Sequence, residues 1–206
     1  MNNKPLLLCL NGEPPSLPLL QALVDRCDFL VAADGAANWL DRYEVTPDLI
    51  LGDFDSFKGE TAVDQIKLET QDNTDGDKAL DWAQSQGVRD VMILGGLGGR
   101  ADFSLYNLSL PLRFPHLNLS FYHREEEVLL AKKTTCWTEK IGSNVSLLAL
   151  GGPVTGLSTE GLSWKLDGAK LTLDGLQSQS NRACGTAVTC TYETGHLLVF
   201  RPHHLT

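Results

Sequence analysis

Short aliphatic runs alternate with helical patterns along the first 123 residues. The strands expected from these runs are 5–10, 29–33, 48–51, 91–94, 117–122 and, more weakly, 66–69. Apolar positions at helical spacing predict helices over 16–26, 36–43, 59–65, 75–86 and 102–112. The apolar runs are continuous rather than alternating, which is typical of parallel strands covered on both faces by helices. We therefore predict an α/β domain with a mostly parallel, Rossmann-like sheet over residues 1–123.

The pattern changes near residue 124. Short β-rich runs at 145–150, 170–173, 187–192 and 196–200 are separated by turns that contain glycine. No helical pattern lies among them, so residues 124–206 are predicted to form a second domain, an all-β sandwich. The charged run 124–127 is interpreted as a solvated connection.

Acidic residues follow the predicted parallel strands. Asp34 comes after strand 29–33, Asp53 and Asp55 come after strand 48–51, and Asp72 and Asp75 precede the helix at 75–86. Parallel strands bring their carboxyl ends to one edge of a sheet, where open α/β proteins bind ligands. Taken singly, each aspartate is better interpreted as a turn or cap residue. Together they would repel one another unless cations neutralise them, and an all-oxygen ligand set suits Mg²⁺.

The stretch Asp53-Phe54-Asp55 has an arrangement of its own. Residues two apart in an extended backbone point to the same side. Asp53 and Asp55 should therefore face one ion or two adjacent ions, while Phe54 turns back into the apolar interior.

A glycine-rich stretch offers two interpretations. The residues from Gly96 to Ala101 fit the dinucleotide fingerprint G-x-G-x-x-A between a strand and a helix, which predicts a nicotinamide- or flavin-dependent oxidoreductase. The fingerprint usually opens the first βαβ unit, however, and this one comes late. Alternatively, the glycines let backbone N–H groups approach a triphosphate, with Arg100 as a charged donor. No G-x-x-x-x-G-K-[ST] sequence occurs, which excludes a P-loop enzyme.

Composition narrows the functional classes. The net charge of −9 argues against a nucleic-acid partner, and no apolar run approaches the roughly 20 residues that span a membrane. The five cysteines include no C-x-x-C pair, which favours a reducing compartment, the cytoplasm, over a disulfide framework or a zinc site.

Four segments of the first domain, in this order and spacing, resemble the thiamine pyrophosphokinase family. They are AADGAAN (32–38), PDLILGDFDS (47–56), QDNTDGDKAL (71–80) and LGGLGGRADFSLYN (94–107). In the second domain, GLSWKL (161–166) and SQSN (178–181) are also similar to that family. The resemblance implies a Mg²⁺-dependent transfer of the pyrophosphoryl group of ATP to the hydroxyethyl oxygen of thiamine, which yields thiamine diphosphate and AMP. It also implies a homodimer, with thiamine bound near the subunit interface by the β domain. A pyrophosphokinase with another acceptor, such as a hydroxymethylpterin, and a non-catalytic nucleotide sensor remain alternatives.

The resemblance also implies roles for individual residues. The implied metal ligands are Asp53, Asp55 and Asp75; the implied catalytic residues are these three with Asp72 and Arg100. The implied ATP-binding residues are Asp34, Asn38, Gly98, Gly99, Arg100, Asp102 and Asn107. The implied thiamine-binding residues are Gln71, Trp164, Ser178, Ser180 and Asn181. Any general base would be Asp72 or Asp75. The chain departs from the family at Phe103, where a polar residue is common, and at Gly76, where a bulkier one is common.

Overall fold

The computed structural model describes residues 4–54, 62–67 and 73–205. The chain divides into two compact units, Met1–Arg124 with His204–Thr206, and Glu125–His203. Among the described residues, no helix is long and apolar enough to cross a membrane.

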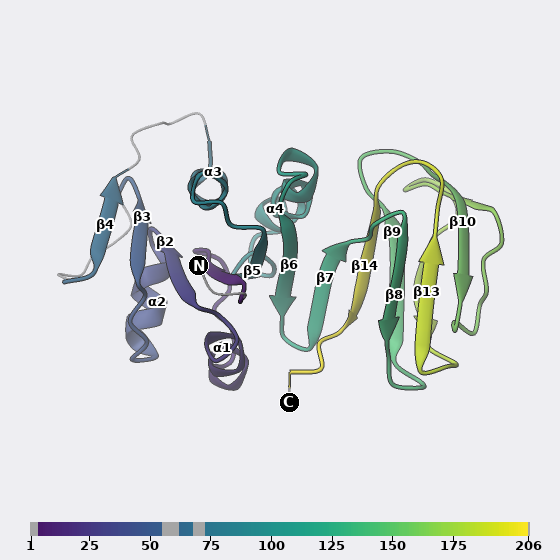
Figure 1. Cartoon of the computed structure of the whole chain (residues 1–206), viewed down its shortest axis with the longest axis horizontal. Helices are drawn as coiled ribbons and strands as arrows, with labels where there is room; N and C mark the ends of the chain where they lie inside the picture. Colours follow the sequence, from purple (N-terminus) through teal and green to yellow (C-terminus); the bar gives the residue numbers. More distant parts are fainter. Residues whose placement is uncertain (1–3, 55–61, 68–72, 206) are drawn as a thin grey trace. The chain divides into compact units, whose positions relative to one another are not determined.

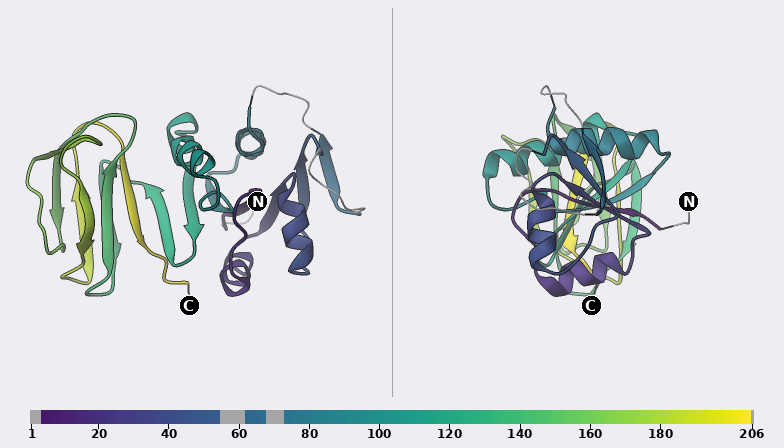
Figure 2. Two further views of the ribbon diagram at one scale, coloured as in Figure 1. Left: turned by 180° about the vertical axis from the view of Figure 1, so that it is seen from behind. Right: turned by 90° about the vertical axis from the view of Figure 1, so that its left-hand side faces the viewer.

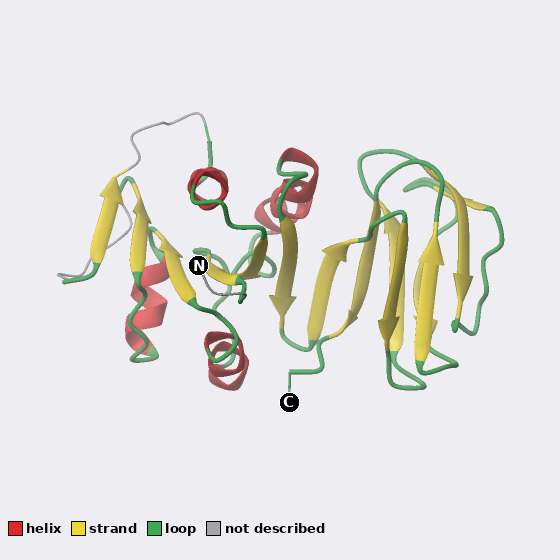
Figure 3. Cartoon of the chain, viewed as in Figure 1, coloured by secondary structure: helices red, strands yellow, loops and turns green. Residues whose placement is uncertain are grey.

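The first unit contains parallel strands and all the described helices of the chain (Figure 1 and Figure 3). Its elements are β1 (Leu6–Cys9), α1 (Leu17–Val24), β2 (Phe29–Ala33), α2 (Ala36–Arg42), β3 (Leu49–Gly52), β4 (Asp64–Lys67), α3 (Asp75–Ser85), β5 (Asp90–Leu94), α4 (Ala101–Arg113) and β6 (Asn118–His123). The strand order is β4-β3-β2-β1-β5-β6, and each neighbouring pair is parallel. The chain thus runs outward from β1 to β4 and resumes on the other side of β1 with β5.

Helices cover both faces of these strands, as the continuous apolar runs predict. Figures 1 and 2 show α1 and α2 on one side of the sheet and α3 and α4 on the other. On the first side, alternate strand residues such as Leu7, Ala32 and Ile50 form one core with Leu20 and Trp39 of the helices. The central strands β1, β2, β3 and β5 are therefore buried along almost their whole length.

The helix predicted over 59–65 is wrong where the structure describes it. Asp64 and Gln65 belong to β4, which pairs in parallel with Leu49 and Ile50 of β3. Residues 59–61 lie outside the described part of the chain. β4 is a polar edge strand, so backbone pairing with β3 rather than side-chain periodicity determines its conformation.

In the second unit, all of whose residues are described, every element is a strand (Figure 3). The strands are β7 (Glu126–Leu130), β8 (Thr134–Thr138), β9 (Asn144–Ala149), β10 (Val154–Glu160), β11 (Ala169–Leu171), β12 (Ser178–Arg182), β13 (Ala187–Thr191) and β14 (Leu197–Pro202). Antiparallel pairing gives the orders β12-β9-β14-β7 and β11-β10-β13-β8. Side chains of both sheets, among them Leu147, Leu157, Val188 and Val199, share one core.

The interpretation of residues 124–127 as a solvated connection is wrong for its second half. Glu126 and Glu127 begin β7, and Glu127 is buried opposite Arg201 of β14. Arg201 Nη2 lies 2.7 Å from Glu127 Oε2, and Arg201 Nε donates a hydrogen bond of 2.9 Å to the same oxygen. A half-buried cross-strand partner, Arg201, therefore compensates the charge of Glu127 that suggested exposure.

Candidate active site

The carboxyl ends of β1, β2, β3 and β5 lie along one edge of the parallel sheet in the first unit. The order of the strands reverses between β1 and β5, and this reversal is the usual place for a ligand crevice in open α/β sheets. The loops that follow these strands contain most of the predicted ATP- and metal-binding residues.

Asp34 follows β2 and is almost fully buried, with 1% of its surface exposed. Its φ of 41° is left-handed, and its N–H donates to the Leu51 carbonyl at 2.7 Å. A Cβ on Gly52 would lie 2.7 Å from the Asp34 Cβ, so only glycine at the end of β3 lets the two strand exits approach. Asn38, half-buried in α2, lies one helical turn beyond Asp34.

Asp53 leaves the edge of the sheet directly after Gly52, with 39% of its side chain exposed. Phe54 packs against the core of the first unit, as predicted. However, its φ of 64° is left-handed, so the premise of an extended backbone through Asp53-Phe54-Asp55 is wrong at Phe54. A left-handed turn lets the chain leave the sheet while the Phe54 ring stays in the apolar layer. Asp55, with Gln71 and Asp72, lies outside the described residues.

Lys78 contacts both Asp53 and Asp75, the two predicted metal ligands that lie within the described residues. Asp75 is in the first turn of α3, and Lys78 follows one turn later with only 6% of its side chain exposed. The Lys78 Nζ lies 3.2 Å from Asp75 Oδ1 and 4.0 Å from Asp53 Oδ2. Two carboxylates from distant segments therefore face one buried cation. Within the described ranges, no three acidic, histidine or cysteine side chains gather as a metal site.

The glycine loop, residues 95–100, connects β5 to α4. Gly98 and Gly99 have consecutive φ values of 83° and 64°, which favour glycine. Arg100 and Asp102 form an exposed ion pair with a 2.6 Å contact between Nη2 and Oδ2. The hydrogen bond from Arg100 lowers the pKa of Asp102, and the same bond raises that of Arg100. The Arg100 guanidinium also lies 4.4 Å from the centre of the Phe103 ring. Phe103, where the chain departs from the family pattern, therefore makes a cation–π contact with this arginine.

Asn107 lies beneath the glycine loop rather than open to solvent. It is 5% exposed, and its Nδ2 donates to the Gly96 carbonyl at 2.7 Å. Asn107 therefore anchors the loop that carries the predicted phosphate-binding glycines.

The second unit brings its predicted thiamine-binding residues together around one turn. Trp164 is 62% exposed, whereas Asn181 is 2% exposed. Asn181 Oδ1 accepts the Trp164 N–H at 3.1 Å, and its Nδ2 donates to the Trp164 carbonyl at 2.7 Å and to Ser178 Oγ at 3.1 Å. Ser180, exposed, has a left-handed φ of 55°. Trp164 and Ser180 therefore face solvent, while Asn181 and Ser178 hold the backbone behind them.

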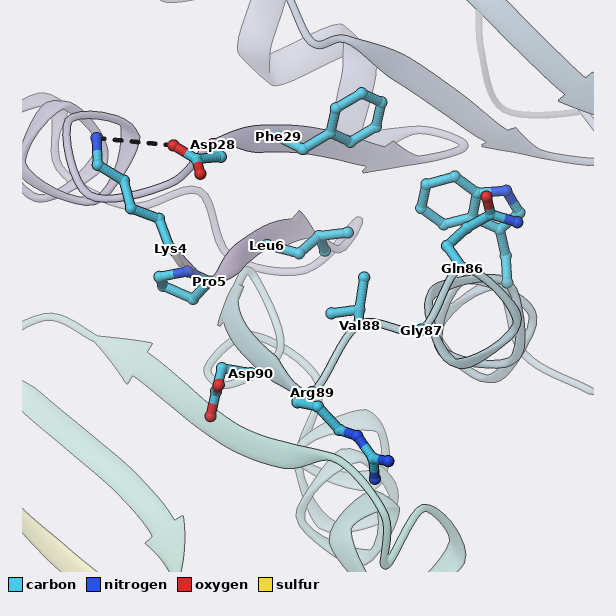
Figure 4. A pocket seen from close by; sticks show the side chains of 11 residues that line it. Lys4, Pro5, Leu6, Asp28, Phe29, Gln86, Gly87, Val88, Arg89 and Asp90 are labelled. Atoms are coloured by element: carbon cyan, nitrogen blue, oxygen red, sulfur yellow. Dashed lines mark ion pairs between the residues drawn. The ribbon is translucent and has the colours of Figure 1, made fainter. Parts of the chain in front are cut away.

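A cavity of about 750 Å³ lies at the other ends of the parallel strands (Figure 4). It is lined by Lys4, Pro5, Leu6, Asp28, Phe29, Trp82, Gln86, Gly87, Val88, Arg89 and Asp90. Leu6, Phe29 and Asp90 are the first residues of β1, β2 and β5, so this cavity is separate from the edge that carries Asp34 and Asp53.

Four residues beside the predicted site were not predicted from the sequence: Glu13, Asp77, Lys78 and Tyr106. Thr74 and Asp77 form a capping box that the spacing T-x-x-D could have shown. Lys78 had a weaker signal, a lysine three residues after Asp75 in a helix. Glu13 and Tyr106 make contacts across 86 and 29 positions of sequence, which no local pattern indicates.

Comparison with known proteins matches both units of the chain. Residues 20–123 match the family model described as the catalytic domain of thiamin pyrophosphokinase, and residues 134–197 match its vitamin B1 binding domain. Thiamine pyrophosphokinase 1 of Oryza sativa subsp. japonica is 28% identical over 82% of this chain and 75% of its own length. The Bacillus subtilis (strain 168) thiamine pyrophosphokinase is 26% identical over 92% of this chain and 95% of its own length.

Solved structures establish the fold. Yeast thiamin pyrophosphokinase superposes with a TM-score of 0.84 over 98% of this chain and 88% of its own, at 22% identity. The Candida albicans protein gives the same TM-score over 97% of this chain and 90% of its own, at 20% identity. These matches do not favour the oxidoreductase alternative. The two family models together account for most of the sequence, and the chain belongs to the thiamin pyrophosphokinase family.

Proposed function

We propose that this chain is an ATP:thiamine diphosphotransferase. The hydroxyethyl oxygen of thiamine attacks the β-phosphorus of ATP and forms a new P–O bond. The bond between that phosphorus and the α–β bridging oxygen breaks, AMP leaves with the electron pair, and the hydroxyl proton passes to a carboxylate or to water. The products are thiamine diphosphate and AMP.

The observation that supports this proposal most directly is the convergence of Asp53 and Asp75 on the Lys78 ammonium group. Pyrophosphoryl transfer depends on positioning and charge neutralisation more than on covalent chemistry of the protein. An edge of a parallel sheet where buried positive charge faces two carboxylates suits a polyphosphate with its counter-ion.

The donor set fits Mg²⁺. Asp53 and Asp75 are oxygen donors with partly exposed side chains, and Mg²⁺ typically takes one or two carboxylates together with waters and phosphate oxygens. Asp53, Asp55 and Asp75 would hold the ion, which would supply charge neutralisation to the phosphates. In this proposal Lys78 keeps Asp53 and Asp75 oriented toward one point.

The remaining assignments follow the same proposal. The glycine loop would bind phosphate oxygens through backbone N–H groups, with Arg100 and Asp102 at its end and Asp34 and Asn38 on the neighbouring strand exit. Asn107 would hold the loop. Gln71 and Asp72 would lie near the acceptor alcohol, and Asp72 or Asp75 would take its proton. Trp164 and Ser180 would contact thiamine, and Ser178 and Asn181 would support them.

Several broader expectations are also proposed. The first domain, residues 1–123, would be a Rossmann-like catalytic domain, and residues 124–206 would form a sandwich for thiamine binding and dimerisation. A homodimer in the cytoplasm, with no nucleic-acid or membrane partner, completes the proposal. Light scattering of the purified chain tests the dimer.

The decisive experiment supplies the purified chain with ATP, MgCl₂ and thiamine and separates the products. AMP and thiamine diphosphate in equal amounts are expected, and ADP would contradict pyrophosphoryl transfer. Asp75→Asn should lower the rate by about 100-fold or more, since it removes a carboxylate that would hold Mg²⁺ beside the phosphates. Asp81→Asn, an exposed change in the same helix, is the control and should leave the rate unchanged. Equal rates for the two variants would contradict the role of Asp75.

A further inference from the structure

Asp77 is a buried carboxylate with hydrogen-bond donors from two helices. It lies in the first turn of α3 with no exposed surface. Its Oδ2 accepts hydrogen bonds from the Thr74 N–H at 3.1 Å and from Thr74 Oγ1 at 2.7 Å. The first of these, together with the 3.3 Å hydrogen bond from the Asp77 N–H to Thr74 Oγ1, forms the capping box of α3. Asp77 Oδ2 also accepts a hydrogen bond of 2.5 Å from the Tyr106 hydroxyl of α4. Arg113 Nη1, at the end of α4, lies 2.7 Å from Asp77 Oδ1.

Capping of α3 does not require the contacts that Asp77 makes with Tyr106 and Arg113 of α4. A capping box is complete with the two residues Thr74 and Asp77, and it functions on the helix surface. Burying the carboxylate is unfavourable unless charged and hydroxyl donors replace its water. The Tyr106 hydroxyl is such a donor, and the Arg113 guanidinium compensates the charge through its ion pair with Asp77. Arg113 also contacts the Tyr106 hydroxyl and lies 5.4 Å from the centre of its ring. The network therefore fixes the first turn of α3 against one face of α4.

Both helices joined by this network carry proposed phosphate- or metal-handling residues. The first turn of α3 holds Asp75 and Lys78, immediately beside Asp77. In α4, Asn107 directly follows Tyr106 and donates to the Gly96 carbonyl of the glycine loop, and Ser104 Oγ lies 3.3 Å from the Gly98 carbonyl as a further donor. One turn of α4 thus contacts α3 through Tyr106 and the glycine loop through Asn107.

We infer that Asp77, Tyr106 and Arg113 form a positioning network that sets the distance between the Asp75–Lys78 turn and the glycine loop during pyrophosphoryl transfer. The inference rests on the proposed function. None of the three residues contacts a reacting atom in it; they act through Asp75, Lys78 and the glycine loop. A misplacement of about 1 Å in such an arrangement can lower a rate by about 100-fold.

Tyr106→Phe tests the network with the least disturbance. It keeps the ring beside Arg113 and removes only the hydroxyl that donates to Asp77. Tyr43→Phe is the matched control: its hydroxyl, also partly buried, donates to the Pro15 carbonyl at 2.7 Å in the same unit, away from α3 and α4. Tyr106→Phe should lower kcat by about tenfold, with the KM for thiamine unchanged, whereas Tyr43→Phe should keep the wild-type kcat. Tyr106→Phe should lose more thermal stability than Tyr43→Phe, because the Tyr106 hydroxyl donates to Asp77 and accepts from Arg113, whereas the Tyr43 hydroxyl makes one hydrogen bond. The change in kcat at unchanged KM, and not the loss of stability, is therefore the measurement that tests the network.

A double-mutant cycle provides a second measurement. Asp77→Asn and Tyr106→Phe should be non-additive in kcat because they break the same network, whereas Asp77→Asn and Tyr43→Phe should be additive. If Asp77→Asn does not fold, Arg113→Lys takes its place in the cycle. A wild-type chain that forms no AMP and thiamine diphosphate would overturn the function and the network together. An active wild type whose kcat is equally affected by Tyr106→Phe and Tyr43→Phe would overturn the network alone.

Discussion

Glu13 Oε2 accepts a hydrogen bond of 3.1 Å from the backbone N–H of Gly99, 86 residues further along the chain. The other carboxylate oxygen of Glu13 lies 3.2 Å from the Arg124 guanidinium. The loop after β1 and the glycine loop after β5 are therefore joined at the reversal of strand order. Glu13 occupies a backbone N–H that the proposed function gives to a phosphate group.

Removal of this carboxylate should strengthen ATP binding. Glu13→Gln leaves a neutral side chain at the glycine loop and removes a negative charge from the neighbourhood of the phosphates. A gain of about 1 kcal/mol, or about a fivefold lower KM for ATP, is expected at low ionic strength. Initial rates at varied ATP measure it. Glu44→Gln, at an exposed position of the same unit, should leave the KM unchanged. A higher KM in Glu13→Gln would mean that Glu13 shapes the loop rather than competing with the ligand.

The same carboxylate predicts a pH dependence of stability. The hydrogen bond from Arg124 lowers the pKa of Glu13 below its ordinary value of 4.5, and the Gly99 N–H contributes in the same direction. A lowered pKa in the folded state stabilises the protein above the ordinary value, and this contribution disappears as the pH falls through the lowered pKa. Denaturant titrations of wild type and Glu13→Gln should therefore differ most near neutral pH and converge in acid. A difference that grows in acid would contradict the ion pair.

Lys78 should stabilise the metal-free protein. Lys78→Met removes the cation between Asp53 and Asp75 and leaves two partly exposed carboxylates facing each other. The loss should be about 1 kcal/mol, because solvent screens both acids. Thermal unfolding with a chelator and then with MgCl₂ measures it: Mg²⁺ should raise the Tm of Lys78→Met more than that of wild type. An equal increase of Tm with Mg²⁺ in both proteins would contradict the idea that Mg²⁺ and the Lys78 ammonium group interact with the same two carboxylates.

Asn181 should determine thiamine binding through Trp164. In Asn181→Ala, the Trp164 N–H and carbonyl lose their hydrogen-bond partners. This loss should destabilise the turn that carries Trp164 by about 1–3 kcal/mol. The KM for thiamine should rise by about tenfold, and the KM for ATP should stay the same. Asn144→Ala, at an exposed position of β9 in the same unit, is the control. A change in both KM values would indicate a loss of folding rather than of a binding surface.

The hydrophobic pattern predicted helices and strands in the first unit and only strands in the second, but four strands of the second unit, β7, β8, β10 and β12, were not predicted. Buried runs such as Phe29–Ala33 require cover on both faces and were predicted to be parallel strands, and the structure shows them so. The family was also recognised from six segments whose order and spacing resemble those of the family. The weak segments failed: polar β4 has no periodicity of its own, and residues 126–127 look like a charged loop until Arg201 pairs with Glu127.

Which charged side chains contact one another depends on how distant segments of the chain pack together. Asp53 and Asp75 were predicted to converge, but the cation between them, Lys78, depends on how α3 lies against the sheet. The sequence also did not show that Asn181, predicted to bind thiamine, hydrogen-bonds to the backbone of Trp164. Side-chain partners such as Glu13 with Gly99, or Asp77 with Tyr106, are distant in sequence. Hydrophobic periodicity specifies which face of an element is buried, whereas hydrogen bonds and ion pairs depend on atomic distances that only the packed elements set.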